Sequence, residues 1–149
     1  MAKKSKEPIF TWDEQSGLAT CILTDGDNVY IGTAQCSEQD QDMKSEKTGC
    51  YIAECRAQIN YLTHVRDNEL KPALKALNRL YYSMNQSKQF NSNSYENKML
   101  QRQIHALEFD LTVVKDMLAQ EKQNLKEYLN QKAKAYAKIR DLRASAKRG

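Results

Sequence analysis

Residues 100–118 read LQRQIHALEFDLTVVKDML, and their apolar side chains recur at alternating spacings of four and three. This spacing places them on one face of an α-helix and is the heptad pattern of a coiled-coil seam. The register continues to residue 142, and neither Gly nor Pro occurs between residues 95 and 148. The sequence therefore predicts one long helix, whose seam positions are Leu100, Ile104, Leu107, Leu111, Val114, Leu118, Glu121, Leu125, Tyr128, Lys132, Ala135, Ile139 and Leu142.

An earlier long helix is predicted over residues 50–87, where the apolar stripe contains Ile52, Cys55, Ile59, Leu62, Leu70, Leu74, Leu77, Tyr81 and Met84. Pro72 lies inside this stretch. Because proline lacks a backbone N–H and its ring clashes with the carbonyl four residues earlier, we expect a bend or a restart there. The Ser- and Asn-rich segment 86–94 is predicted to be the tip loop of an antiparallel helical hairpin, with Ser92 or Ser94 capping the next helix.

The two predicted helices differ in length. At about 1.5 Å per residue, the second would be roughly 75 Å long and the first roughly 57 Å long. The second helix would therefore extend beyond the first by about a dozen residues. Its apolar seam between Leu125 and Leu142 would lack a partner within the chain. We therefore expect this overhang to pair with another copy, to pair with a partner or to fray, and we favour a homo-oligomer.

Residues 9–36 predict a three-stranded antiparallel β-meander, with strands over 9–12, 18–24 and 29–36. Turn chemistry separates them at residues 13–17 and at the Asp25-Gly26 step. One face would carry small side chains that allow a helix to approach closely: Cys21, Leu23, Tyr30, Gly32, Ala34 and Cys36. The predicted fold class is α+β, mostly α, with this meander preceding the long, coiled-coil-like helical hairpin.

The domain plan that follows has a basic, disordered segment 1–8, a meander over 9–36, a polar connection over 37–48, a hairpin over 50–145 and a tail over 146–149. The chain has 149 residues, of which 40% are hydrophobic, and a mean hydropathy of −0.79. These values favour an elongated helical protein, in which each helix buries only a stripe of apolar side chains. The sequence contains neither a membrane span nor an export signal, which predicts a cytoplasmic location and no membrane partner.

Catalytic and metal-binding patterns have little support in this sequence. The four cysteines are Cys21, Cys36, Cys50 and Cys55, and none forms a C-x-x-C pair. We expect reduced structural thiols and no metal. His64 and His105 have polar neighbours and no recognisable catalytic context. The sequence therefore predicts a binding protein that is not an enzyme and uses no cofactor.

Two local features are candidate ligand contacts. Arg56 lies close to the apolar stripe of the first helix, where it either extends along the helix edge or presents a fixed guanidinium to a phosphate or carboxylate. The loop residues Phe90, Asn91 and Asn93 either close the hairpin tip or bind a base by stacking and hydrogen bonding.

The net charge of +4 is concentrated at the chain ends. Residues 131–149 contain seven Lys or Arg against a single acid, Asp141. Such a stretch is either a solvated helix end or a nucleic-acid contact, whose affinity would fall steeply with salt. We expect residues 132–148 to act mainly in assembly.

Two segments resemble a known group of proteins. Residues 32–36 give the pattern G-x-A-x-C, Asp40 follows, and residues 49–57 give G-x-x-I-A-x-x-R-A. This pattern resembles small phage and prophage proteins of Gram-positive bacteria. The order of a small sheet and two helices is also similar to the anti-Thoeris sponge proteins of phages.

The resemblance implies capture of a cyclic ADP-ribose-type signal at a subunit interface. It places Arg56 at the motif position and offers Arg102 and His105 where the family has paired arginines. The predicted ligand-binding residues are Arg56, Phe90, Asn91, Asn93 and Arg102.

The leading functional hypothesis is a phage-encoded, non-catalytic binding protein that counteracts a host defence in the host cell cytoplasm by sequestering a small nucleotide-like ligand. One alternative is a protein–protein inhibitor of a host defence complex, similar to an anti-CRISPR protein. Another is a nucleic-acid-associated coiled-coil protein. A sponge predicts a pocket at a subunit interface that is lined by Arg56 and by loop residues, whereas an inhibitor predicts no pocket and a charged face instead.

Overall fold

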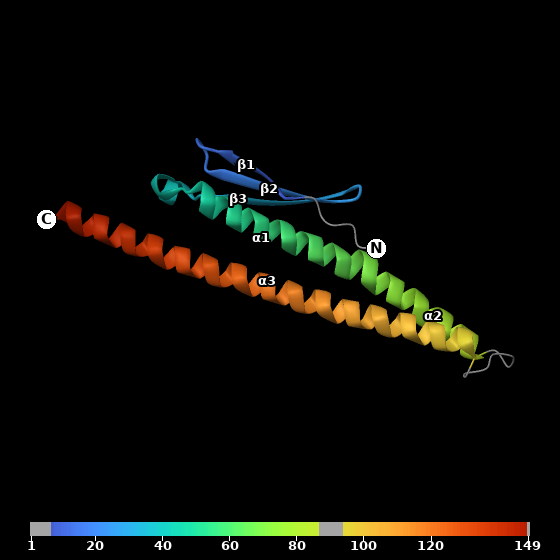
Figure 1. Ribbon diagram of the computed structural model, residues 1–149. Helices are drawn as coiled ribbons and strands as arrows, with labels where there is room; N and C mark the ends of the chain where they lie inside the picture. Colours follow the sequence, from blue (N-terminus) through green and yellow to red (C-terminus); the bar gives the residue numbers. More distant parts are fainter. Residues whose placement is uncertain (1–6, 87–93, 149) are drawn as a thin grey trace. The chain divides into compact units, whose positions relative to one another are not determined.

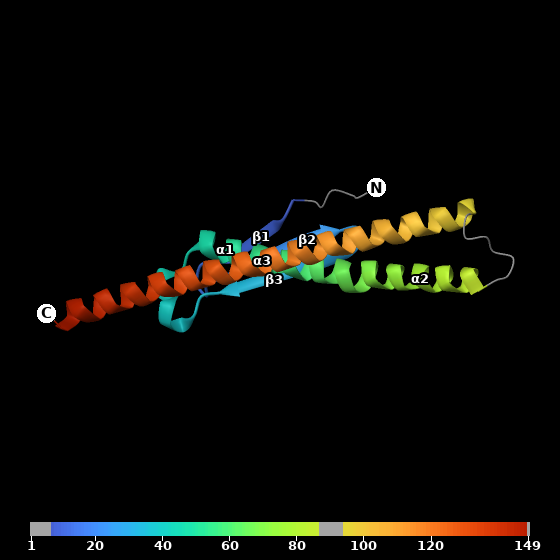
Figure 2. The ribbon, with the colours of Figure 1, turned by 90° about the horizontal axis from the view of Figure 1, so that it is seen from below.

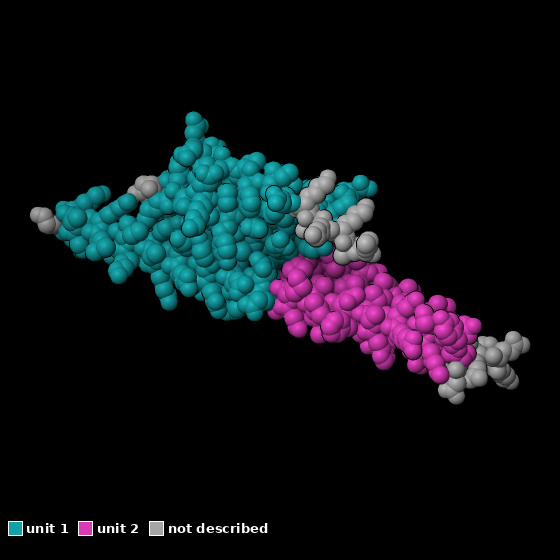
Figure 3. All heavy atoms as spheres, viewed as in Figure 1, with its two compact units in different colours: residues 1–61, 120–149 teal, residues 62–119 magenta. Residues whose placement is uncertain are grey.

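The computed structural model describes residues 7–86 and 94–148 and shows an α+β fold that is mostly helical (Figure 1). Its elements are β1 (Ile9–Asp13), β2 (Leu18–Asp25), β3 (Asn28–Gln35), a 3-10 segment η1 (Glu38–Met43), α1 (Glu46–His64), a π-helical segment η2 (Val65–Leu70), α2 (Lys71–Gln86) and α3 (Tyr95–Arg148). The chain divides into two compact units, residues 1–61 with 120–149 (unit 1) and residues 62–119 (unit 2) (Figure 3).

The predicted meander is confirmed as an antiparallel sheet in the order β1-β2-β3. The first turn is closed by Asp13, whose carboxylate accepts hydrogen bonds from the backbone N–H of Gln15 at 3.0 Å and the Ser16 hydroxyl at 2.7 Å. At the second turn, Asp25 pairs with Asn28 and Gly26 has φ of 61°. A positive φ at the first of two loop residues is the geometry of a type II′ hairpin.

The inner face of the sheet packs on α1 through small residues from both elements. A Cβ atom added at Gly32 would overlap the Ala53 carbonyl oxygen and the Ala57 backbone nitrogen. A Cβ added at Gly49 would come within 3.0 Å of Ala19. Because Gly49, Ala53 and Ala57 are four residues apart, they share one helix face. The core of unit 1 forms where this face meets the sheet, and its buried residues are Ala19, Cys21, Leu23, Tyr30, Ala34, Ala53 and Ala57.

The edge of the sheet at β3 is covered by side chains of α1. Arg56 donates from Nη1 to the Thr33 carbonyl at 2.7 Å, and Asn60 donates from Nδ2 to the Ile31 carbonyl at 2.8 Å. An uncovered edge offers such carbonyls to a strand of another chain. The two side chains therefore satisfy acceptors that would otherwise be available for strand pairing.

Unit 1 has three layers, with α1 between the sheet and the C-terminal half of α3 (Figures 1 and 2). Tyr51 of α1 packs against Tyr128 of α3, with ring centroids 4.3 Å apart. Farther along α3, Arg140 forms an ion pair with Asp40 of η1 at 2.7 Å. Residues 125–140 of α3, which the sequence analysis assigned to an unpartnered overhang, therefore have contacts within their own chain.

Near the C-terminus of α3, the positions predicted from the heptad register are no longer the buried ones. Ile139 and Leu142, two predicted seam positions, are 36% and 63% exposed. Tyr136 and Arg140 are half-buried instead. An ideal α-helix drifts by about 20° per heptad relative to a strict seven-residue repeat. Over several heptads this drift moves the inward face by about one residue, which explains the difference.

Helix α1 begins at Glu46, four residues before the predicted start. The Ser45 hydroxyl accepts a hydrogen bond from the Thr48 backbone N–H at 3.3 Å, as an N-cap does. Gly49 lies inside α1, where its lack of a side chain allows close packing on the sheet.

In unit 2, α2 and the first part of α3 lie side by side and run in opposite directions (Figures 1 and 2). Gln101 of α3 donates to the Tyr81 hydroxyl of α2 at 2.9 Å. The Ser94 hydroxyl accepts from the Asn97 N–H at 3.2 Å, which confirms the predicted cap of α3. Before Pro72, η2 interrupts the α-helical ladder, and the Lys71 N–H bonds to the carbonyl of Arg66, five residues earlier.

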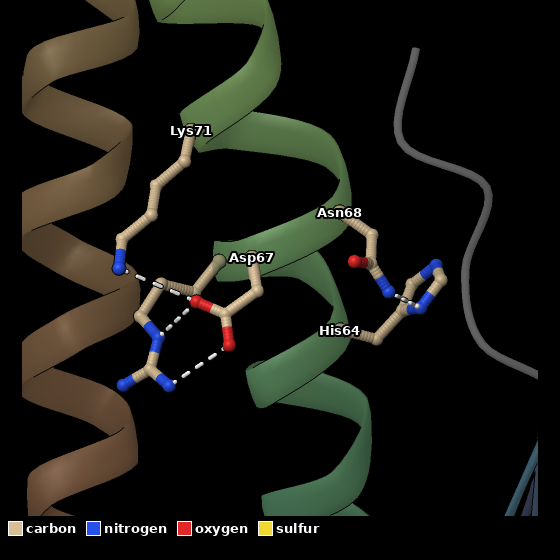
Figure 4. Close-up of polar contacts among 5 residues, drawn as sticks. His64, Asp67, Asn68 and Lys71 are labelled. Atoms are coloured by element: carbon tan, nitrogen blue, oxygen red, sulfur yellow. Dashed lines mark hydrogen bonds and ion pairs between the residues drawn. The ribbon is translucent and has the colours of Figure 1, made fainter.

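The π-helical segment carries a small polar cluster (Figure 4). Asp67 accepts hydrogen bonds from Arg66 at 2.8 and 3.1 Å and forms an ion pair with Lys71 at 3.4 Å. The Arg66 hydrogen bond is the main reason why the pKa of Asp67 falls from 3.8 to about 2. The contact between Asn68 and His64, 2.8 Å long, lies on another side of the helix.

Candidate functional site

Unit 1 contains a cavity of about 370 Å³ at the junction of β3, η1, the first turns of α1 and the C-terminal part of α3. Trp12 of β1 and Gly17 of the first turn complete its wall. Cavities that bind small organic molecules have volumes of about 300–1,000 Å³. The cavity therefore has the size of a small-molecule site.

Hydrogen bonds fix the wall that η1 provides. The Gln41 side-chain amide donates to the carbonyls of Ser16 at 3.0 Å and Cys36 at 2.9 Å. Lys44 donates from Nζ to the Gln15 carbonyl at 3.2 Å. These contacts attach η1 to the β1–β2 turn and to the end of β3. The polar connection predicted over residues 37–48 therefore forms part of the cavity wall.

The lining carries an excess of positive charge. It includes Lys44, Lys132 and Arg140, and its single described carboxylate is that of Asp40. Arg140 pairs with Asp40, whereas neither lysine forms an ion pair with any residue that the structure describes. Lys132 instead lies 5.5 Å from the centroid of the Tyr128 ring, at cation–π distance. Such a lining favours a negatively charged ligand.

Two half-buried aromatic side chains, Trp12 and Tyr136, also line the cavity. The indole N–H of Trp12 is buried and has no acceptor among the described residues. Burial is the main reason why the pKa of Tyr136 is raised, and nearby Cys36, Tyr128 and Asp40 add to it. A flat ring could pack against either side chain, and an acceptor on it could bind the indole N–H.

Cys36 is the cysteine in this lining. Its thiol donates to the Asp40 carbonyl at 3.0 Å. Burial, followed by the negative charge of Asp40, raises the pKa of Cys36. A raised pKa favours the protonated thiol, which is a poor nucleophile. The Cys36 thiol therefore serves as a hydrogen-bond donor in this wall.

Neither of the two predicted ligand-binding residues that the structure describes, Arg56 and Arg102, lines the cavity. Arg56 is exposed, donates to the Thr33 carbonyl and does not line the cavity. Arg102 is an exposed residue of α3 in unit 2, whereas the cavity belongs to unit 1. Phe90, Asn91 and Asn93 lie outside the described residues. The structure therefore brings none of the described candidates into the cavity.

The sequence did contain one signal for the cavity. Lys132 was predicted as a polar seam position and Arg140 as a member of the basic tail, and both face the cavity. Nothing in the sequence indicated that Trp12 and Asp40 line the cavity, because their positions depend on contacts between distant segments.

The part of the chain that the structure describes contains no group of three or more His, Cys, Asp or Glu side chains that could hold a metal ion. Within the same residues, no helix combines the length and the apolar character needed to cross a membrane. Comparisons with protein-family models, with curated protein sequences and with solved structures find no match to this chain.

Proposed function

We propose that this protein is a non-catalytic binding protein that holds a small organic anion with a flat ring in the unit 1 cavity. One observation carries the proposal: three cationic and two aromatic side chains line a cavity of about 370 Å³, against one described carboxylate. Cationic groups bind the charge of such a ligand, and aromatic side chains provide stacking area. Cys36 also lines the cavity, and burial raises the pKa of its thiol, which favours the neutral form over the nucleophilic thiolate.

The resemblance to the anti-Thoeris sponge family makes the proposal more specific. The ligand is then a cyclic ADP-ribose-type signal, and the protein acts in the host cytoplasm by removing that signal from solution. The cavity takes the place of Arg56 and Arg102 as the binding site. Coiled-coil-like pairing of the long helices and assembly into a homo-oligomer belong to the same proposal.

Isothermal titration calorimetry with cyclic ADP-ribose and with ADP tests this proposal. Lys132→Gln should weaken binding by roughly fivefold, because it removes one charge-assisted contact from the lining. Lys134→Gln is the matched control, since Lys134 is exposed on the same helix and does not line the cavity. The ligand should be recovered unchanged after incubation, as chromatography of the released nucleotide would show.

Absence of measurable heat with both compounds would refute the proposal. The protein–protein inhibitor and the nucleic-acid-associated protein would then be the remaining hypotheses. If ADP binds and cyclic ADP-ribose does not, the anion-binding function stands and the sponge hypothesis fails.

A further inference from the structure

Asp40 is the one described carboxylate in a lining that otherwise favours anions. The residue is only 9% exposed. One carboxylate oxygen accepts a hydrogen bond from Arg140 Nη1 at 2.7 Å, and the other accepts from the Ser37 hydroxyl at 2.9 Å. All three residues line the cavity. The carboxylate therefore occupies a preformed set of donors inside the proposed binding site.

These donors are the kind that bind a ligand oxyanion. A guanidinium and a hydroxyl converging on two oxygens of one group match a phosphate as well as a carboxylate. In the present structure that position is taken by a side chain of the protein. An oxyanion that enters the cavity must therefore either compete with Asp40 for Arg140 or bind beside it against like-charge repulsion.

The backbone at Asp40 is irregular, although the side chains of Gln41 and Lys44 attach its segment to neighbouring elements. Asp40 lies in η1, a six-residue 3-10 segment, and its own backbone is not helical, with φ of −115° and ψ of 18°. Segments of this kind are short and have weaker hydrogen-bond geometry than α-helices. Withdrawal of the carboxylate would therefore disrupt little regular structure, whereas Arg140 is held by the long helix α3.

The charge of the lining indicates which anion would replace the carboxylate. Once Asp40 has withdrawn, Lys44, Lys132 and Arg140 line the cavity with no other described carboxylate in its wall. A single negative charge would leave most of this positive charge unbalanced. A ligand with two or more negative charges neutralises it better, and a diphosphate carries them on two groups that can reach separate cations.

We infer that Asp40 occupies the position of a ligand phosphate at Arg140, and that the ligand is an aromatic diphosphate that binds by displacing this carboxylate. The inference rests on the proposed function, because it assigns the ligand class and the regulation of the same cavity. Arg140 is then the anchor of one phosphate, and Asp40 lowers the affinity of the site.

The single tryptophan of the chain makes this inference measurable, because Trp12 lines the cavity. Its fluorescence is recorded while the full-length protein is titrated with ADP, AMP or adenosine. The variants are Asp40→Asn, which retains the shape but removes the charge, and Arg140→Gln. Lys138→Gln is the matched control, since Lys138 is exposed on α3 and does not line the cavity.

The expected order of affinity for the wild type is ADP, then AMP, then adenosine. Asp40→Asn should tighten ADP binding by roughly tenfold and Arg140→Gln should weaken it by a similar factor, as expected for one charge-assisted hydrogen bond. Lys138→Gln should behave as the wild type. Asp40→Ala provides a second variant if Asp40→Asn does not fold, because it also removes the carboxylate while retaining the Ser37 and Arg140 donors, and it should also tighten ADP binding.

Two results would overturn the inference while leaving the proposed function intact. One is weaker or unchanged ADP binding by Asp40→Asn and Asp40→Ala, when Lys132→Gln still weakens binding. The other is equal affinity for ADP and AMP, which would remove the diphosphate assignment. If neither the wild type nor Asp40→Asn responds to any of the three compounds, the proposed function fails and this inference fails with it.

Discussion

The guanidinium of Arg56 donates a hydrogen bond to the Thr33 carbonyl at 2.7 Å, and this contact accounts for an arginine that the sequence presents as a ligand residue. Its neighbours in the G-x-x-I-A-x-x-R-A pattern have a similar explanation. Gly49, Ala53 and Ala57 form the helix face that packs on the sheet. The pattern that carries the resemblance is therefore accounted for by packing of α1 against β2 and β3.

Arg56→Ala should leave ligand binding within about twofold of the wild type, because Arg56 does not line the cavity. The free energy of unfolding should fall by about 1 kcal/mol, the typical net contribution of one hydrogen bond. The uncovered β3 edge should also increase self-association. Calorimetric titration, urea unfolding and sedimentation velocity measure these three effects. Loss of binding by a stable, folded Arg56→Ala protein would restore Arg56 to the site.

Gly32→Ala should be among the most destabilising substitutions in unit 1. The new methyl group would overlap backbone atoms of Ala53 and Ala57, which cannot rotate away as a side chain can. We expect a loss of about 3 kcal/mol or more, at the upper end for overpacked cores. Urea unfolding measures it, with Thr33→Ala on the exposed face as the control. A loss similar to that of the control would contradict the close packing of α1 on the sheet.

Truncation at two positions tests which part of the C-terminal helix contributes to ligand binding. Ending the chain after Gln131 removes Lys132, Tyr136 and Arg140 from the cavity and should abolish ligand binding. Ending it after Asp141 retains the lining and should leave binding unchanged. Fluorescence titration with ADP distinguishes the two, and circular dichroism reports whether the shortened proteins remain helical. Equal binding by both truncated proteins would show that α3 does not contribute to the site.

The pKa of Asp67 gives a prediction for unit 2. Carboxyl titration by NMR should show a midpoint of about 2, and Arg66→Gln should return it toward 3.8. Because the pKa is lowered in the folded protein, the stabilising contribution of Asp67 is present above pH 3.8 and is lost as the pH falls toward 2. Lys75→Gln serves as the control, since Lys75 is exposed on α2 and forms no ion pair with a described residue. An unchanged Asp67 pKa in Arg66→Gln would contradict the contact in Figure 4.

The sheet and the course of α3 could be predicted because their signals are local. Alternation and turn residues define the strands, and apolar spacing defines the long helix. The cavity could not be predicted in the same way. Asp40 and Arg140 are 100 residues apart in the chain, and heptad spacing alone did not indicate which basic residues of the tail face inward. The inward face shifts toward Tyr136 and Arg140 because the period of an α-helix differs from that of the seven-residue repeat, and this shift accumulates along α3.

The cysteines show a similar limit. The sequence analysis predicted structural thiols, and Cys21 and Cys55 are buried, with burial as the main cause that raises the pKa of each to about 11. Cys36 differs because it is half-buried at the cavity, where its thiol donates to the Asp40 carbonyl. Its place at the end of β3 is visible in the sequence, but the cavity beside it is created by η1 and α3.

The most direct test of the central claim is a two-dimensional amide NMR titration of the full-length protein with ADP, which locates the ligand residue by residue. The account predicts shifts concentrated in residues 34–52 and 129–140 and at Trp12, including its indole N–H, with residues 71–86 unchanged. Shifts centred on Arg56 and Arg102, or no shifts at saturating ADP, would contradict it.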